Sequence, residues 1–192
     1  MRLMKPLELD RISQVLAKGS CPICAFVKND QAALLRGELQ PDRVTDLCNF
    51  HAWALAAAVD RDKVARIFLQ VLNRQVSRSP VPSAGQCSFC SQLVQQEVIH
   101  IQELIAQLEA GGLVLDWIKR QGTFCLSHAS HLRELAPSRL HSVIDEIMDR
   151  SAKALATNLE DLLLRTEEGK GTGGGVLGRA AEFLASQRGI NR

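Results

Sequence analysis

The sequence contains no tyrosine, and aromatic residues make up only 4% of its 192 positions. So few rings leave few surfaces on which nucleic-acid bases could stack, which argues against a protein that binds single strands. The sequence also has no large excess of positive or negative charge. It contains 23 Lys and Arg residues and 21 Asp and Glu residues, which give a formal net charge of +2. This balance provides no general attraction to nucleic acid or to a membrane surface.

Long hydrophobic runs are missing as well. No segment approaches the length of about 20 apolar residues that spans a membrane, and MRLMKPLELDRISQ at the start contains no stretch typical of a signal peptide. We therefore expect a cytoplasmic protein that does not bind membranes. Cysteines stay reduced in the cytosol, so metal binding is favoured over three disulfides.

No cysteine lies outside one repeated pattern, a C-x2-C pair followed by a C-x2-H pair. The first copy is Cys21, Cys24, Cys48 and His51, and the second is Cys87, Cys90, Cys125 and His128. Each copy offers three thiolates and one imidazole, the usual ligands of a tetrahedral zinc site with no open position. The sequence therefore predicts two zinc ions per chain. Because each copy is complete, we expect each ion to be held within one copy, although an exchange of pairs between the copies stays open.

Other chemistry remains possible at these cysteines. An iron–sulfur cluster is the main alternative to zinc, although clusters usually take four cysteines. Cys21-Pro22-Ile23-Cys24 also resembles a redox-active dithiol, but the strand–helix–strand context of such motifs is missing. Buried thiols without metal are the third interpretation.

The remaining histidines and the tryptophans are expected to have ordinary structural roles. His131 could replace His128 as a ligand, but a solvated or capping histidine is favoured. His100 and His141 are expected on helix surfaces. Trp53 and Trp117 are expected to cover the metal sites as part of the core.

Apolar residues recur at intervals of three and four, and no alternating pattern of a strand is present. This spacing predicts an all-α fold, a helical bundle built from two pseudo-repeated metal-centred halves. One expected helix carries an apolar face and ends at Gly111-Gly112. That face consists of Val94, Val98, Ile101, Ile105 and Leu108.

We expect residues 1–80 to form the first half and residues 81–168 the second, with a Ser-, Pro- and Gly-rich linker at 77–86. Residues 169–192 should form a flexible Gly-rich linker and a short amphipathic tail helix. Since each half is too small to bury its own apolar surface, the halves are expected to pack as one body.

The twin motifs, CPIC…LCNFHAWAL and CSFC…FCLSHASHL, resemble those of an uncharacterised bacterial family with paired CPxC…(L/F)CxxH motifs. The resemblance covers about residues 20–165 and implies a helical metal-binding protein. It supplies no activity. Ser88 stands where the family pattern has proline.

The leading functional interpretation is a non-enzymatic, zinc-stapled scaffold that binds another protein, because no catalytic constellation stands out. An enzyme would need an open coordination position at one site. One alternative is an iron–sulfur electron carrier or redox sensor. The second is a nucleic-acid-binding regulator, for which a helix face offers Lys63, Arg66, Arg74 and Arg78.

Overall fold

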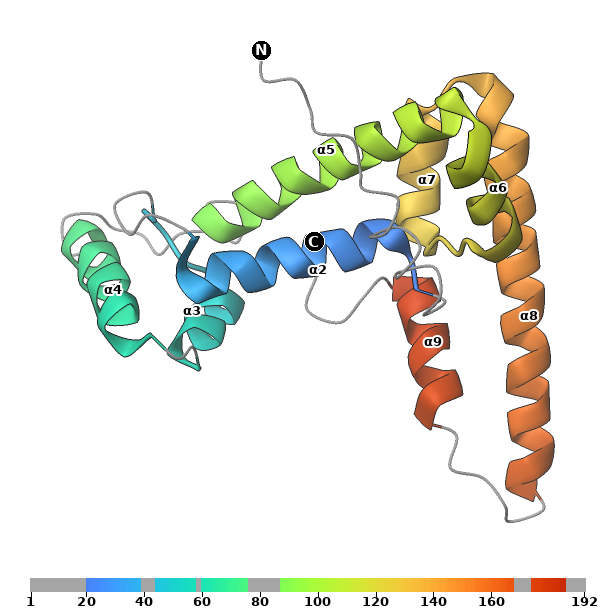
Figure 1. The fold of residues 1–192 in the computed structure, drawn as a ribbon. Coiled ribbons are helices and arrows are strands. Elements are labelled where there is room, and N and C mark those ends of the chain that lie inside the picture. The colour runs from blue at the N-terminus through green and yellow to red at the C-terminus, as the bar shows by residue number, and fades with distance from the viewer. Residues whose placement is uncertain (1–19, 39–43, 58–59, 76–86, 168–173, 186–192) are drawn as a thin grey trace. The chain divides into compact units, whose positions relative to one another are not determined.

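The computed structural model describes residues 20–38, 44–57, 60–75, 87–167 and 174–185. All regular elements of these residues are helices, which confirms the all-α class (Figure 1). They are α2 (Pro22–Ala33), which continues as the π-helical turn η1 (Leu34–Glu38), α3 (Asn49–Ala56), α4 (Arg61–Gln75), α5 (Ser88–Ala110), α6 (Gly112–Gln121), α7 (Leu126–Leu135), the 3-10 turn η4 (Ser138–Leu140), α8 (His141–Glu167) and α9 (Gly174–Ala185). The expected linker at 77–86 and the Gly-rich start of the tail lie outside the described residues, apart from the first residues of α9.

The chain divides into two compact units. One consists of Met1–Phe26 together with Ile99–Arg192, and the other of Val27–Val98. Helices α2 and α5 each contribute residues to both units. The expected division at residue 80, and the packing of the two halves as one body, stay predictions.

The Val27–Val98 unit has a small core that includes part of a Cys pair. Its buried members are Val44, Leu55, Ile67, Val71, Cys87 and Phe89. In α4 the buried Ile67 and Val71 are four residues apart and share one face, whereas Leu69 and Leu72 are exposed. The core therefore joins one face of α4 to α3 and to the start of α5.

In the larger unit, the second half of α5 buries the expected apolar face. Ile101, Ile105 and Leu108 are buried, as predicted. Val94 and Val98, in contrast, are 56% and 41% exposed, so this part of the prediction is wrong. The buried positions of the first half are Phe89, Leu93 and Glu97 instead, and the last two lie one residue before Val94 and Val98 on the helix.

Helix α5 ends where it was expected to end. Gly111 and Gly112 have φ angles of 73° and 70°, which glycine adopts without the cost that a Cβ imposes. The chain bends by 107° between α5 and α6. Within the described residues no single helix has the length and hydropathy of a membrane span, and α5 and α6 reach them only as this bent pair.

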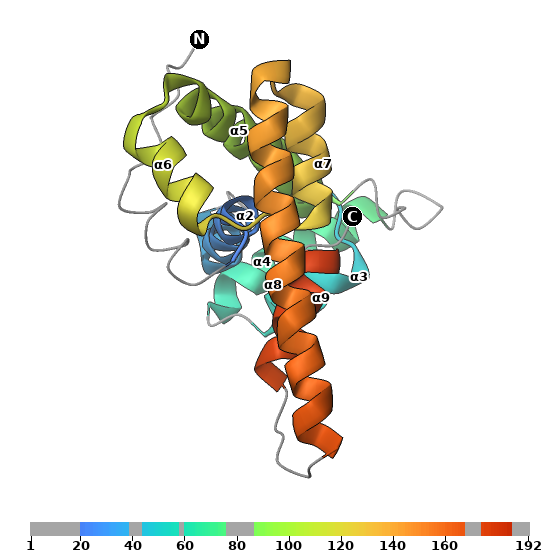
Figure 2. The ribbon, with the colours of Figure 1, turned by 90° about the vertical axis from the view of Figure 1, so that its right-hand side faces the viewer.

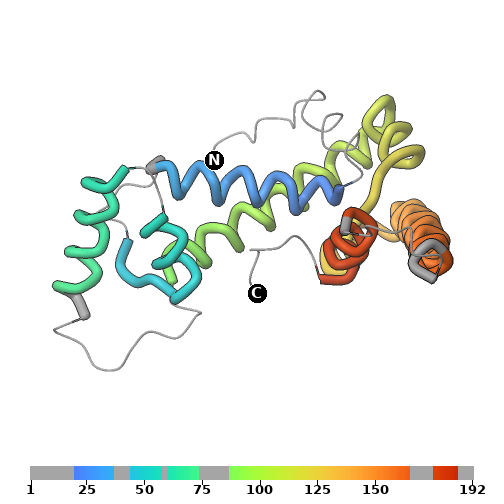
Figure 3. Tube along the Cα trace, turned by 90° about the horizontal axis from the view of Figure 1, so that it is seen from below, coloured from blue at the N-terminus to red at the C-terminus, as the bar shows by residue number. Residues whose placement is uncertain are grey.

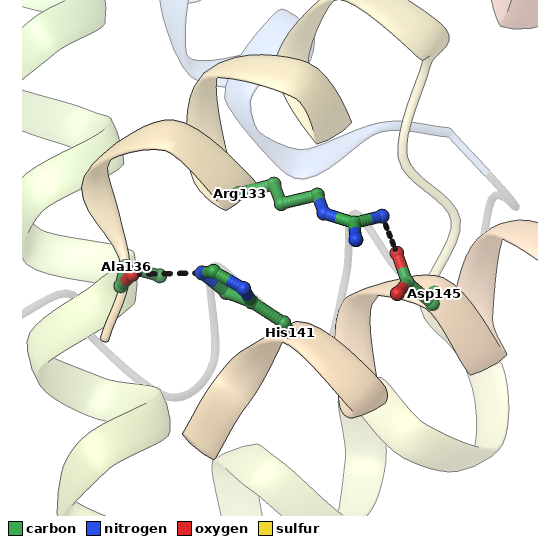
Figure 4. Close-up of polar contacts among 4 residues, drawn as sticks. All are labelled: Arg133, Ala136, His141 and Asp145. Carbon is green, nitrogen blue, oxygen red and sulfur yellow. Dashed lines mark hydrogen bonds and ion pairs between the residues drawn. The ribbon is translucent and has the colours of Figure 1, made fainter. Parts of the chain in front are cut away.

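Helices α7 and α8 form a helical hairpin, and polar contacts join them near the connection (Figure 4). His141 Nε2 lies 3.0 Å from the carbonyl oxygen of Ala136, and Arg133 pairs with Asp145 at 2.7 Å. The two helices run side by side (Figure 2). Helix α9 packs against both of them (Figure 3), so the tail helix is part of this unit.

Candidate metal centres

The eight predicted ligands form two clusters, and in each the four ligand atoms lie within 4.8 Å of one another. Cluster A consists of Cys21, Cys24, Cys125 and His128. Cluster B consists of Cys48, His51, Cys87 and Cys90. The expected pairing within each copy of the motif is therefore wrong. Each C-x2-C pair meets the C-x2-H pair of the other copy.

A helix follows each Cys pair and carries the chain away from it. Helix α2 has 12 residues and α5 has 23, so at 1.5 Å per residue they carry the chain about 18 Å and about 34 Å along their axes. A long helix therefore separates each Cys pair from the next C-x2-H pair. The 15-residue helix α4 likewise separates His51 from Cys87, so helix length alone does not decide which pairs meet.

All four motifs have the same local structure. The carbonyl oxygens of Cys21, Cys48, Cys87 and Cys125 each accept a hydrogen bond from the N–H four residues later, at 3.1, 2.9, 3.0 and 2.9 Å. Each first cysteine thus begins a helix, and the second ligand follows three residues later on the same side. The positive ends of two helices therefore meet at each cluster, which favours thiolates there.

All four residues of cluster A are buried. Cys24, Cys125 and His128 are 0% exposed, and Cys21 is 6% exposed. His128 Nδ1 lies 3.5, 3.2 and 3.1 Å from the sulfurs of Cys21, Cys24 and Cys125, and the sulfurs of Cys24 and Cys125 are 3.7 Å apart. The imidazole therefore offers Nδ1 to a metal ion.

Cluster B has nearly the same geometry but is more open. His51 Nδ1 lies 3.3, 3.5 and 3.4 Å from the sulfurs of Cys48, Cys87 and Cys90, and the sulfurs of Cys48 and Cys90 are 3.8 Å apart. Cys87 and His51 are buried, whereas Cys48 and Cys90 are half-buried. One edge of this cluster therefore lies near solvent.

The imidazole of His51 is held by two phenylalanines. Its ring stacks on Phe89 with centroids 5.2 Å apart, and Phe50 meets it edge-on at 5.1 Å. Its Nε2 is buried, and no acceptor reaches it among the described residues. At the Nε2 side of the ring, aromatic packing and not a hydrogen bond from those residues therefore holds the imidazole in place.

Ser88 joins the two motifs of cluster B. Its Oγ accepts hydrogen bonds from the backbone N–H groups of Thr45 and Asp46 at 3.0 and 3.4 Å, and it lies 3.1 Å from Thr45 Oγ1. The N–H of Ser88 also donates to the carbonyl oxygen of Asp46 at 3.0 Å. Proline could not make this last bond. Ser88 therefore links the start of α5 to the segment before Cys48.

Arg150 and Gly122 position the segment that leads to Cys125. The guanidinium of Arg150 donates to the carbonyl oxygens of Lys119 and Gly122, the latter at 2.8 Å. A Cβ at residue 122 would collide with the carbonyl oxygen of Ile118. Neither residue stood out in the sequence, because one Arg and one Gly carry no local pattern.

The thiol pKa values differ in the same way in both clusters. In cluster A, hydrogen bonds from Cys21 and Cys24 hold the pKa of Cys125 far below its usual value, whereas burial raises the pKa of Cys21. In cluster B, burial raises the pKa of Cys48 but the backbone of His51 and the Cys87 and Cys90 thiols more than offset it, so the pKa is lowered. Burial, followed by repulsion from Cys87, raises the pKa of Cys90 to about 12. Without metal, each cluster therefore concentrates negative charge on the cysteine of the C-x2-H pair.

The other sequence expectations have mixed outcomes. His131 belongs to neither cluster. His100 is buried and packs on Phe26 with centroids 5.3 Å apart, so its expected surface position is wrong. Trp53 is 73% exposed and does not cover a metal site as expected. Trp117 is half-buried.

Comparison with known families, curated proteins and solved structures finds no match to this chain. The resemblance to the bacterial family therefore rests on the twin motifs alone. Two Cys and His clusters with the composition and spacing of metal centres are the finding from which function can be argued.

Proposed function

We propose that this protein binds two zinc ions, one in each cluster, and that they act as structural cross-links of a non-enzymatic scaffold. The observation that carries the proposal is the spacing of the ligand atoms. Zinc bonds of about 2.3 Å to sulfur and about 2.0–2.1 Å to nitrogen place tetrahedral ligands about 3.8 Å apart for two sulfurs and about 3.6 Å for sulfur and nitrogen. The sulfur pairs here are 3.7 and 3.8 Å apart, and the sulfur–nitrogen pairs 3.1–3.5 Å.

The same spacing favours one ion over an iron–sulfur cluster. In an iron–sulfur cluster the four protein ligands are divided among two or four irons, so the whole set is spread more widely than the four ligands of a single ion. Four protein ligands also fill a tetrahedral zinc ion and leave no position for an activated water molecule. This supports a structural role and gives no support to metal-assisted hydrolysis.

The cross-links join helix starts that are far apart in sequence. In cluster A the start of α2 meets the start of α7, and in cluster B the start of α3 meets the start of α5. Because metal binding at such a site is folding free energy, the proposal gives each unit one ion on which its packing depends. We place the protein in the cytoplasm, where its thiols stay reduced.

The proposed partner of the scaffold is another protein. The exposed ring of Trp53 and the exposed Leu69 and Leu72 of α4 lie in the smaller unit, and tryptophan is enriched where proteins meet. The near-neutral charge and the few aromatic rings of the chain give less support to the nucleic-acid alternative.

Native mass spectrometry of protein purified without a metal-affinity tag tests the proposal. Two zinc ions per chain are expected, with no colour. Several irons and inorganic sulfide would favour the electron-carrier alternative, and intact thiols without metal would contradict both.

A further inference from the structure

We propose that Cys48 and Cys90 are an oxidation site, at which a peroxide converts the two thiolates to a disulfide and releases the metal ion of cluster B. This proposal rests on the metal binding proposed above. It adds that the two clusters differ in reactivity, with cluster A protected and cluster B responsive.

Exposure separates the two clusters. Three ligands of cluster A are 0% exposed and the fourth, Cys21, is 6% exposed, whereas Cys48 and Cys90 of cluster B are both half-buried. A thiolate reacts with a peroxide only if the oxidant can reach its sulfur. Both clusters hold thiolates when metal is bound, so access decides which one reacts.

A cavity of about 160 Å³ adjoins cluster A but does not open it. Its wall includes Cys21, Cys24, Cys125 and Phe183. Cys24 and Cys125 are nevertheless closed to a water molecule, and hydrogen peroxide is larger than water. Phe183 of α9, itself only 9% exposed, lines the cavity together with these cysteines.

The sulfurs of the two half-buried cysteines of cluster B are placed to join. They are 3.8 Å apart, and a disulfide of about 2.05 Å requires them to approach by about 1.8 Å. The sulfurs of Cys24 and Cys125 are as close, at 3.7 Å. Distance therefore permits a disulfide at both clusters, and exposure selects cluster B.

The chemistry balances with hydrogen peroxide as the oxidant. The Cys48 sulfur attacks one peroxide oxygen, the O–O bond breaks, and hydroxide leaves and is protonated to water. The Cys90 thiolate then displaces the second hydroxide from the Cys48 sulfur, and this hydroxide also becomes water. Two sulfurs have supplied two electrons, and the metal ion keeps only Cys87 and His51, too few ligands to hold it.

The test uses the full, zinc-loaded chain treated with hydrogen peroxide. Released zinc is followed with a chelating dye, and free thiols are alkylated before peptide mapping. We expect one equivalent of zinc to leave at least tenfold faster than the other. Peptide mapping should then show a disulfide between Cys48 and Cys90, whereas Cys21, Cys24 and Cys125 remain free thiols and are alkylated. Equal rates, or a first disulfide between Cys24 and Cys125 or between Cys87 and Cys90, would overturn the proposal.

A matched pair of variants tests whether access is the cause. Phe183→Ala should open cluster A and speed the slow zinc release several-fold, whereas Leu184→Ala, at a neighbouring position that is 63% exposed, should leave it unchanged. An unchanged slow phase in Phe183→Ala would overturn the explanation by exposure. The zinc content of the untreated protein separates this result from a failure of the proposed function, since fewer than two zinc ions would contradict metal binding itself.

Discussion

Replacing Ser88 by proline, the residue at the equivalent position of the other Cys pair (Pro22), should destabilise this protein. Ser88 Oγ accepts from the N–H groups of Thr45 and Asp46 and lies near Thr45 Oγ1, and its own N–H donates to Asp46. Losing the hydroxyl in Ser88→Ala should cost about 1–2 kcal/mol, at about 1 kcal/mol per hydrogen bond. Ser88→Pro also removes the N–H and should cost about 2–3 kcal/mol in total. Proline itself suits the first turn of a helix, so the loss comes from the missing contacts.

Amide hydrogen exchange of the zinc-loaded chain measures this locally. A loss of 2–3 kcal/mol corresponds to exchange about 30- to 150-fold faster in peptides from α3 and the start of α5. Peptides from α7 and α8 should not change, because they belong to the other unit. Ser91→Ala, an exposed position of the same helix, is the control. If Ser88→Pro exchanges like the unaltered protein, the contacts of Ser88 do not hold the two motifs together and the reasoning is refuted.

Three further predictions concern the metal centres and their supports. Gly122→Ala should lower the free energy of unfolding, measured by chemical denaturation, by about 1–3 kcal/mol, because the new Cβ would meet the carbonyl oxygen of Ile118. An unaltered stability would show that the turn before Cys125 can relax. Zinc affinity should rise at least roughly tenfold per pH unit between pH 6 and 8 in a chelator competition assay. The reason is that zinc must displace the proton of Cys90, whose pKa of about 12 keeps its thiol protonated in the metal-free protein. An affinity that does not depend on pH would contradict this. His128→Ala should lose one zinc ion by native mass spectrometry and His131→Ala none, and metal loss in the second variant would place His131 among the ligands.

Much of the fold was predictable because helical periodicity is local. The end of α5 at Gly111 and Gly112 follows from conformations that favour glycine, and the eight ligand residues follow from their spacing. The exposed Val94 shows the limit of this method. A helix face read from spacing can be rotated by one residue, because the partner that buries it is not known from the sequence.

The pairing of the ligands could not be predicted because the two motif copies are chemically equivalent. Either C-x2-H pair could complete either C-x2-C pair, and the choice depends on where α2 and α5 take the chain. The contacts of Ser88 that support cluster B were equally out of reach, because Thr45 and Asp46 lie more than 40 positions away in the sequence. The predicted surface position of His100 was wrong for a similar reason, since its contact partner Phe26 is distant in the sequence.

The exchanged pairing of the clusters is tested most directly by replacing zinc with ¹¹³Cd and measuring its scalar couplings to the cysteine β protons. Each cadmium resonance identifies the cysteines bound to one ion. The structure predicts that one resonance couples to Cys21, Cys24 and Cys125, and the other to Cys48, Cys87 and Cys90. A resonance that couples to Cys21, Cys24 and Cys48 would contradict the account and restore pairing within each copy of the motif.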